Sequence, residues 1–165
     1  MNLERYIVIS GAPGVYRLIS ARHNGVLVED FKEKRNRFIA TRQNQVMPLA
    51  TISIYADTEE GSVPLADVFD RMLKAYPQTP PPASDASSNA LREYFTHVLP
   101  EHDRYRVHIA DIKKCIRWFN FMREYGIFEQ LREAERAEET AATEATSNEK
   151  MLEQADSSTT EETAA

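Results

Sequence analysis

The sequence has little cysteine, little glycine and no long apolar run. Its single cysteine, Cys115, excludes an intrachain disulfide and a cysteine-rich zinc site, which favours a reducing compartment. No apolar stretch approaches the roughly 20 residues that a membrane-spanning helix needs. The N-terminal residues 1–10 lack the small-residue cleavage site of a secretory leader. We therefore expect a cytoplasmic protein with no membrane segment.

A phosphate-binding loop is also missing, although residues 7–17, IVISGAPGVYR, look like a strand that enters one. Such a loop needs a second glycine, then a lysine, then a serine or threonine. Counted from Gly11, those places hold Tyr16, Arg17 and Leu18. The glycines at this point therefore predict a β-turn and not a nucleotide site.

Residue spacings that are typical of metal sites or catalytic sites are absent as well. The four histidines, His23, His97, His102 and His108, do not form a ligand motif, and His102-Asp103 has no evident nucleophile nearby. Cys115 falls on the apolar face of a predicted helix, which indicates a buried and unreactive thiol. We expect no enzymatic activity, no metal and no cofactor.

Charge is divided unevenly along the chain, whose net charge is −6. Residues 1–128 hold 17 basic and 15 acidic side chains, whereas residues 129–165 hold 3 and 11. A slightly positive body followed by a strongly negative tail is compatible with nucleic acid on the body. It is equally compatible with a tail that only keeps the protein soluble.

The first part of the chain predicts short strands. They cover residues 5–9, 15–22, 26–31 and 37–42, with turns at Ser10–Gly14 and at Asn24-Gly25, a strong hairpin signal. Residues 50–55 could form a further strand or a short helical turn. Because closing such a sheet removes its edges, we expect a small antiparallel SH3-like β-barrel.

The middle of the chain changes to a helical period. Residues 64–75 carry one apolar stripe and are expected to pack on the barrel as a flanking helix. A second helix is capped by Ser88 or Asn89 and stops at Pro100, and a third covers about 109–125 and ends at Gly126. In this third helix Phe119 and Phe121 lie about 160° apart, so one packing surface should not cover both.

These signals predict an α+β chain with four parts. Residues 1–76 form the barrel domain with its C-terminal helix, and residues 77–88 are a Pro/Ser-rich linker. Residues 89–137 form a helical module. Residues 138–165, rich in Ala, Glu, Thr and Ser, are expected to be a disordered acidic tail.

Two basic clusters are the candidate binding residues. The first lies on a hairpin of the predicted barrel and the second around the start of the third helix: Lys32, Lys34, Arg35, Arg37 and Arg42, then Arg104, Arg106, Lys113, Lys114 and Arg117. Interleaved carboxylates such as Glu29, Glu33 and Asp111 dilute both clusters. An ordinary solvated surface is therefore the alternative interpretation.

The sequence also resembles a family of uncharacterised bacterial proteins that combine an N-terminal domain of unknown function with a second small helical domain. The matching segments are Ile9-Ser10-Gly11 with Pro13-Gly14 and Tyr16, Val28-Glu29, Ile54-Tyr55, Val63-Pro64-Leu65, Tyr94-Phe95 with Val98-Leu99-Pro100 and Asp103, and Asp111-Ile112-Lys113-Lys114 with Trp118 and Asn120. The resemblance covers about residues 1–128 without the linker. It implies two modules and a variable tail, and no activity.

We therefore expect a non-enzymatic two-module adaptor that binds a protein or a ribonucleoprotein assembly. The alternative is direct RNA or DNA binding through the two basic clusters. The sequence does not predict the oligomeric state.

Overall fold

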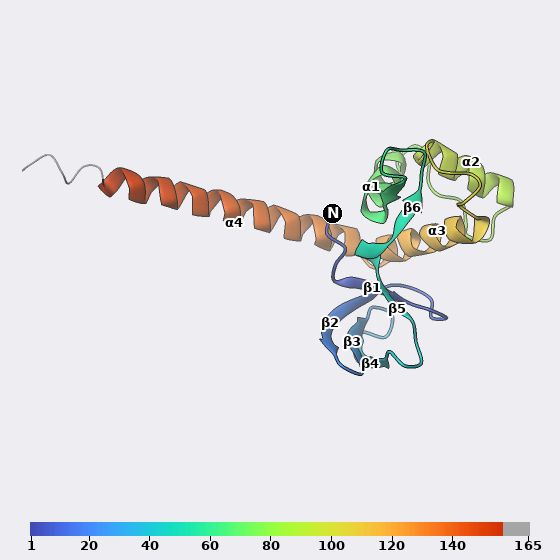
Figure 1. The fold of residues 1–165 in the computed structure, drawn as a ribbon, viewed down its shortest axis with the longest axis horizontal. Helices are drawn as coiled ribbons and strands as arrows, with labels where there is room; N and C mark the ends of the chain where they lie inside the picture. Colours follow the sequence, from blue (N-terminus) through green and yellow to red (C-terminus); the bar gives the residue numbers. More distant parts are fainter. Residues whose placement is uncertain (157–165) are drawn as a thin grey trace, which may run out of the picture. The chain divides into compact units, whose positions relative to one another are not determined.

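The computed structural model describes residues 1–156, with side chains through residue 146, and its architecture is α+β (Figure 1). The strands of this part are β1 (Tyr6–Ile9), β2 (Tyr16–Arg22), β3 (Gly25–Asp30), β4 (Arg35–Ala40), β5 (Val46–Pro48), β6 (Ser53–Tyr55) and β7 (Ser62–Pro64), with the 3-10 turn η1 (Leu49–Thr51) before β6. The helices that follow are α1 (Leu65–Ala75), α2 (Ser88–Val98), α3 (Ile109–Glu124) and α4 (Ile127–Asp156). Residues 1–128 form one compact unit.

The first five strands form an antiparallel sheet in the order β4-β3-β2-β1-β5. Its small core contains Ile7, Ile9, Tyr16 and Val28, all buried. Ile7 and Ile9 are two residues apart, so they share one face of β1, as the period of a strand requires. Short alternating segments therefore formed strands, as the sequence predicts.

This sheet is open, so the expected SH3-like barrel is not confirmed. β4 and β5 are its two edges and do not pair with each other. β5 has only three residues and ends at Pro48, which has no N–H to donate. A strand this short cannot supply the ladder that closure requires.

Both expected outcomes for residues 50–55 occur one after the other. The segment begins within η1 and continues as β6, which pairs with β7 in a separate two-stranded sheet. Pro64 ends β7 directly before α1.

The hairpin at Asn24-Gly25 forms, but its glycine has a different role from the expected one. The two turn residues are His23 and Asn24, because Arg22 already pairs with Gly25. Gly25 is needed for space: a Cβ there would lie 2.3 Å from the carbonyl oxygen of Ile39 on β4.

The helices agree with the predicted periods, with one corrected cap. Ser87, rather than Ser88 or Asn89, caps α2, because its Oγ accepts a hydrogen bond of 3.3 Å from the N–H of Ala90. α3 ends before Gly126, which has a φ of 66° and suits the left-handed position after a helix.

α1 lies against α2, η1 and β7, so it contacts both helical and extended segments. The Phe69 ring lies 6.0 Å from Phe119 of α3 and 5.8 Å from Phe128, measured between ring centroids. Phe121 points to another aromatic group, in which its ring lies 4.5 Å from Tyr125 and 6.4 Å from Phe31. The expected separation of Phe119 from Phe121 is therefore confirmed.

Residues 138–156 form the C-terminal part of α4, and the expected disorder of residues 138–165 stays a prediction. Alanine and glutamate are strong helix formers, which favours a helix in this segment. The hydroxyls of Thr140, Thr143 and Thr146 each donate to the carbonyl four residues earlier, at 2.8 Å. The rest of the expected tail, residues 157–165, lies outside the described residues.

Across the described helices, we find no apolar segment of the length that a bilayer crossing needs.

Candidate partner-binding cleft

A cleft of about 900 Å³ lies between the N-terminal sheet and α3. One wall is the turn at residues 10–14 together with Gln45 and Met47 around β5. The opposite wall is β6, the loop before α3 and one face of α3, which contributes Lys114, Trp118 and Phe121. The cleft therefore brings together segments that are about 100 residues apart in the sequence.

Large apolar side chains face this space from both walls. Tyr55 is 52% exposed and Met47 is 39% exposed, although both belong to strands. Trp118 and Phe121 are half-buried on α3. Aromatic and methionine side chains that remain partly exposed in a concave surface are typical of binding sites.

Three cations of the second basic cluster line the cleft. The Arg106 guanidinium lies 5.3 Å from the centre of the Tyr55 ring and its Nε lies 3.6 Å from Asp103. Lys114 and Arg117 are exposed on α3, and no carboxylate of the described residues lies within ion-pair distance of either side chain. The other two members of that cluster, Arg104 and Lys113, do not line the cleft.

Asp103 has a structural role beside this site. The backbone N–H groups of Tyr105 and Arg106 donate to its Oδ1 at 2.8 and 3.1 Å. These bonds, with the nearby Arg106 charge, hold the pKa of Asp103 below its usual range. Asp103 therefore remains a carboxylate that orders the loop before α3.

Cys115 lies at the base of the cleft and is 2% exposed. Burial raises the pKa of its thiol to about 12, and the Asp111 carboxylate adds to the effect. A thiol with so little thiolate is a poor nucleophile and a poor metal ligand. Its position agrees with the interpretation as a buried, inert side chain.

His102 and His108 have structural contacts and do not line the cleft. His102 is buried, with its Nδ1 2.7 Å from the Leu99 carbonyl oxygen and its ring against Phe95. His108 precedes α3, where its N–H donates to Asp111 at 3.0 Å as part of a capping box. Through the described residues, no three histidine, cysteine or acidic side chains gather closely enough to hold a metal ion.

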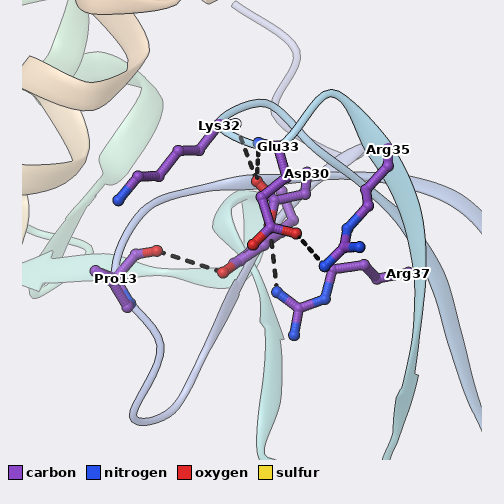
Figure 2. A network of polar contacts seen from close by, with 7 residues as sticks. Pro13, Asp30, Lys32, Glu33, Arg35 and Arg37 are labelled. Carbon is purple, nitrogen blue, oxygen red and sulfur yellow. Dashed lines mark hydrogen bonds and ion pairs between the residues drawn. The ribbon is translucent and has the colours of Figure 1, made fainter.

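The first basic cluster lies on and around the β3–β4 hairpin, where carboxylates neutralise part of it (Figure 2). Asp30, which is 6% exposed, accepts from the N–H groups of Lys32 and Glu33 at 2.9 and 3.2 Å. Its second oxygen accepts from Arg37 at 3.3 Å, and Arg35 pairs with Glu33 at 2.5 Å.

The charge state of Asp30 follows from these contacts. Burial alone would raise its pKa, but the two backbone N–H groups and the Arg37 guanidinium outweigh burial and hold the pKa below its usual range. By contrast, the side chains of Lys32, Lys34 and Arg42 have no carboxylate of the described residues within ion-pair distance. The structure thus separates the two basic clusters and leaves only part of each available to a partner.

The sequence did not predict that the turn at residues 10–14 lines the cleft, because its glycines and proline are fully accounted for by a reversal of the chain direction. Met47 and Tyr55 were not predicted as cleft residues either, because the sequences of their strands do not show which segment lies across the cleft. One available signal was the aromatic run at Trp118–Phe121, which predicts that part of α3 faces away from the helical core.

Comparisons with known proteins divide the chain at this cleft. A family model for a domain of unknown function, DUF5606, matches residues 3–49, and one for a second domain of unknown function, DUF6852, matches residues 52–122. The turn and β5 belong to the first match, and β6 and α3 to the second. The cleft therefore lies at the junction of two domains, a common place for ligand sites.

A solved structure is also similar to this chain. It is an NMR structure of a structural-genomics target from Bacteroides vulgatus, with 37% sequence identity and a TM-score of 0.63. The similarity covers 76% of this chain and 89% of the other. No curated protein matches the chain.

Proposed function

The chain belongs to the bacterial family that joins these two domains of unknown function, and from that premise we propose that it is a non-enzymatic adaptor that binds a protein partner in the cleft beside α3. The observation that carries this proposal is the composition of the cleft. It combines exposed Tyr55 and Met47 with Trp118 and with Lys114 and Arg117, two cations that have no carboxylate of the described residues within ion-pair distance.

This composition supports a protein partner for a physical reason. Aromatic, methionine and arginine side chains are enriched in the cores of protein interfaces, where a few anchors in a pocket supply most of the binding energy. The partner would insert an apolar side chain between Tyr55 and Trp118. An acidic residue beside it would meet Lys114 and Arg117.

Direct RNA or DNA binding is the weaker proposal. Arg35, Arg37 and Arg106 already face carboxylates, which lowers the positive potential that a phosphate backbone would need. Lys114 and Arg117, which have no ion-pair partner among the residues that the structure describes, favour a small anionic contact over a long polyanion track. We further propose a cytoplasmic location and an SH3-like relationship for the open sheet.

Photo-crosslinking in cells tests this function at single positions. A benzoylphenylalanine in place of Tyr55 is expected to capture a specific protein, because this side chain faces the cleft. The matched control replaces Tyr105, which is 93% exposed and outside the cleft. Equal capture from both positions would count against the site.

A charge reversal on α3 sharpens the test. Lys114→Glu is expected to reduce the Tyr55 crosslink at least tenfold, which corresponds to about 1.4 kcal/mol. Lys113→Glu makes the same change on the preceding residue, outside the cleft, and is expected to leave the Tyr55 crosslink intact. A crosslinked species that nuclease removes would favour the nucleic-acid alternative.

A further inference from the structure

We propose that β4 is a docking edge, to which an extended acidic segment of a partner protein adds as a further antiparallel strand. β4 is six residues long and forms one end of the open sheet. It is separate from the cleft beside α3, whose lining includes no residue of β4. The argument rests on the backbone register, on the exposure of one aromatic residue and on charge.

The register shows which backbone groups point out of the sheet. The N–H of Thr41 donates to the carbonyl of Asn24 at 3.2 Å, and β3 and β4 continue from there in regular register to Asp30 and Arg35. Antiparallel pairs alternate between bonded and non-bonded residues. Asn36, Phe38 and Ala40 are therefore the β4 residues that direct their N–H and C=O groups away from β3.

Some of these outward-facing backbone groups already have hydrogen-bond partners. The carbonyl of Ala40 accepts from the N–H of Gln43 and from Nδ2 of Asn44, at 3.4 and 3.2 Å. The N–H and C=O groups of Asn36 and Phe38 have no partner of this kind in the described part of the chain. Two donors and two acceptors are therefore free for another strand, the arrangement that strand addition uses.

The opposite edge of the sheet shows how this protein protects an edge. β5 is three residues long and ends at Pro48, which has no N–H and whose carbonyl accepts the Thr51 hydroxyl at 2.8 Å. β4 has no proline and instead carries Phe38 near its centre, 48% exposed. An apolar side chain on an unpaired edge invites pairing, and proteins usually avoid it.

The two faces of β4 specify the chemistry of the incoming strand. Phe38 lies opposite Leu27 and shares its face with Asn36, so that face favours an apolar residue. Arg35 and Arg37 lie on the other face, where each already contacts a carboxylate. Lys34 and Arg42, which have no carboxylate of the described residues within ion-pair distance, flank the strand. A strand with alternating acidic and apolar residues would place apolar side chains beside Phe38 and acidic side chains toward Lys34 and Arg42.

A second copy of this chain is a poorer occupant. Pairing β4 with itself would set its four nearby cations, Lys34, Arg35, Arg37 and Arg42, against the same four residues. Like charges across a strand pair are destabilising. β5 of another copy offers three residues and a proline, so it cannot extend the ladder.

Hydrogen exchange on the full-length chain tests this proposal with defined probes. The probe is a capped heptapeptide of alternating glutamate and valine, and the control peptide has lysine in place of glutamate. We expect the glutamate peptide, at up to about 1 mM, to slow exchange several-fold at the amides of Asn36 and Phe38. The lysine peptide should leave both amides unchanged.

Proline substitution removes one outward donor without touching the β3–β4 ladder. Asn36→Pro is expected to weaken binding of the glutamate peptide at least tenfold, whereas Asn36→Ala keeps the N–H and should bind normally. If Asn36→Pro fails to fold, a glutamate peptide methylated on its backbone nitrogens makes the same test from the other side.

Three results would overturn the proposal. One is no protection of either amide by the glutamate peptide. Another is binding that survives both the proline variant and backbone methylation. The third is concentration-dependent dimerisation that Asn36→Pro abolishes, which would make a second copy the occupant.

Discussion

The Phe121 ring of α3 lies directly against Gly14, so closely that a Cβ on that glycine would meet Cε2 of the ring at 2.6 Å. Gly14 also has a φ of 94°, which side chains rarely adopt. This contact joins the turn at residues 10–14 to α3. It therefore sets the distance between the two walls of the cleft.

Gly14→Ala is expected to destabilise the chain in two ways, through the backbone and through the clash with Phe121. The backbone effect alone costs about 1–2 kcal/mol, and overpacking adds about 1–3 kcal/mol. Gly11→Ala is the matched control, because Gly11 has a φ of 80° with no atom in the way of a Cβ. Urea unfolding should show a larger loss for Gly14→Ala, and equal losses would contradict the contact.

Gly25→Ala should disturb β4 specifically. The new Cβ would lie 2.3 Å from the carbonyl oxygen of Ile39 and 2.6 Å from the Phe38 ring, and backbone cannot yield as a flexible side chain does. We expect a loss of about 2 kcal/mol or more, together with faster amide exchange along β4. The neighbouring Asn24→Ala, in an exposed turn, should change stability by no more than about 0.5 kcal/mol.

Asp30→Asn should weaken the chain at neutral pH and progressively less in acid. The pKa of Asp30 is lowered in the folded protein, so its charged form contributes stability above the unfolded pKa and loses it as the pH falls through the folded one. At pH 7 the expected cost is about 1–3 kcal/mol, the range for hydrogen bonds to a charged group. Unfolding titrations from pH 7 to about pH 2 should show the two proteins converging, and a constant gap would refute the assignment.

Tyr94→Phe should leave the chain as stable or make it more stable. The Tyr94 hydroxyl is buried without a hydrogen-bond partner among the described residues, and burial raises its pKa to about 12. Removing an unsatisfied buried hydroxyl relieves a penalty of about 1–3 kcal/mol. Tyr16→Phe is the control, since the Tyr16 hydroxyl donates to the Pro13 carbonyl at 3.4 Å. A larger loss for Tyr94→Phe than for Tyr16→Phe in thermal unfolding would contradict this account.

Local periodicity was sufficient for most elements of the fold. The apolar stripe from Leu65 to Leu73 and the cap signals at Ser88 or Asn89 and at Gly126 predict helices, because these preferences act within one or two turns. The opposite orientations of Phe119 and Phe121 follow from helix geometry alone. The helix over residues 138–156 was not predicted, because the absence of apolar bulk was weighed above the helix propensity of alanine and glutamate.

The candidate sites depend on distant neighbours, and sequence reasoning recovered them only in part. Three of the five cations predicted near α3 line the cleft. Whether a cationic side chain forms an ion pair depends on which carboxylate the fold places beside it. Asp30 on β3, for example, pairs with Arg37 on β4.

The amino-acid sequence by itself determined the α+β class, the position of most strands and helices, and the buried state of Cys115. These follow from side-chain period and turn chemistry, which are local. Only the tertiary structure decided that the sheet stays open, that β4 is an unprotected edge, and that the turn at residues 10–14 faces α3. Strand pairing and the approach of Phe121 to Gly14 join residues far apart in the chain, and no local pattern encodes those distances.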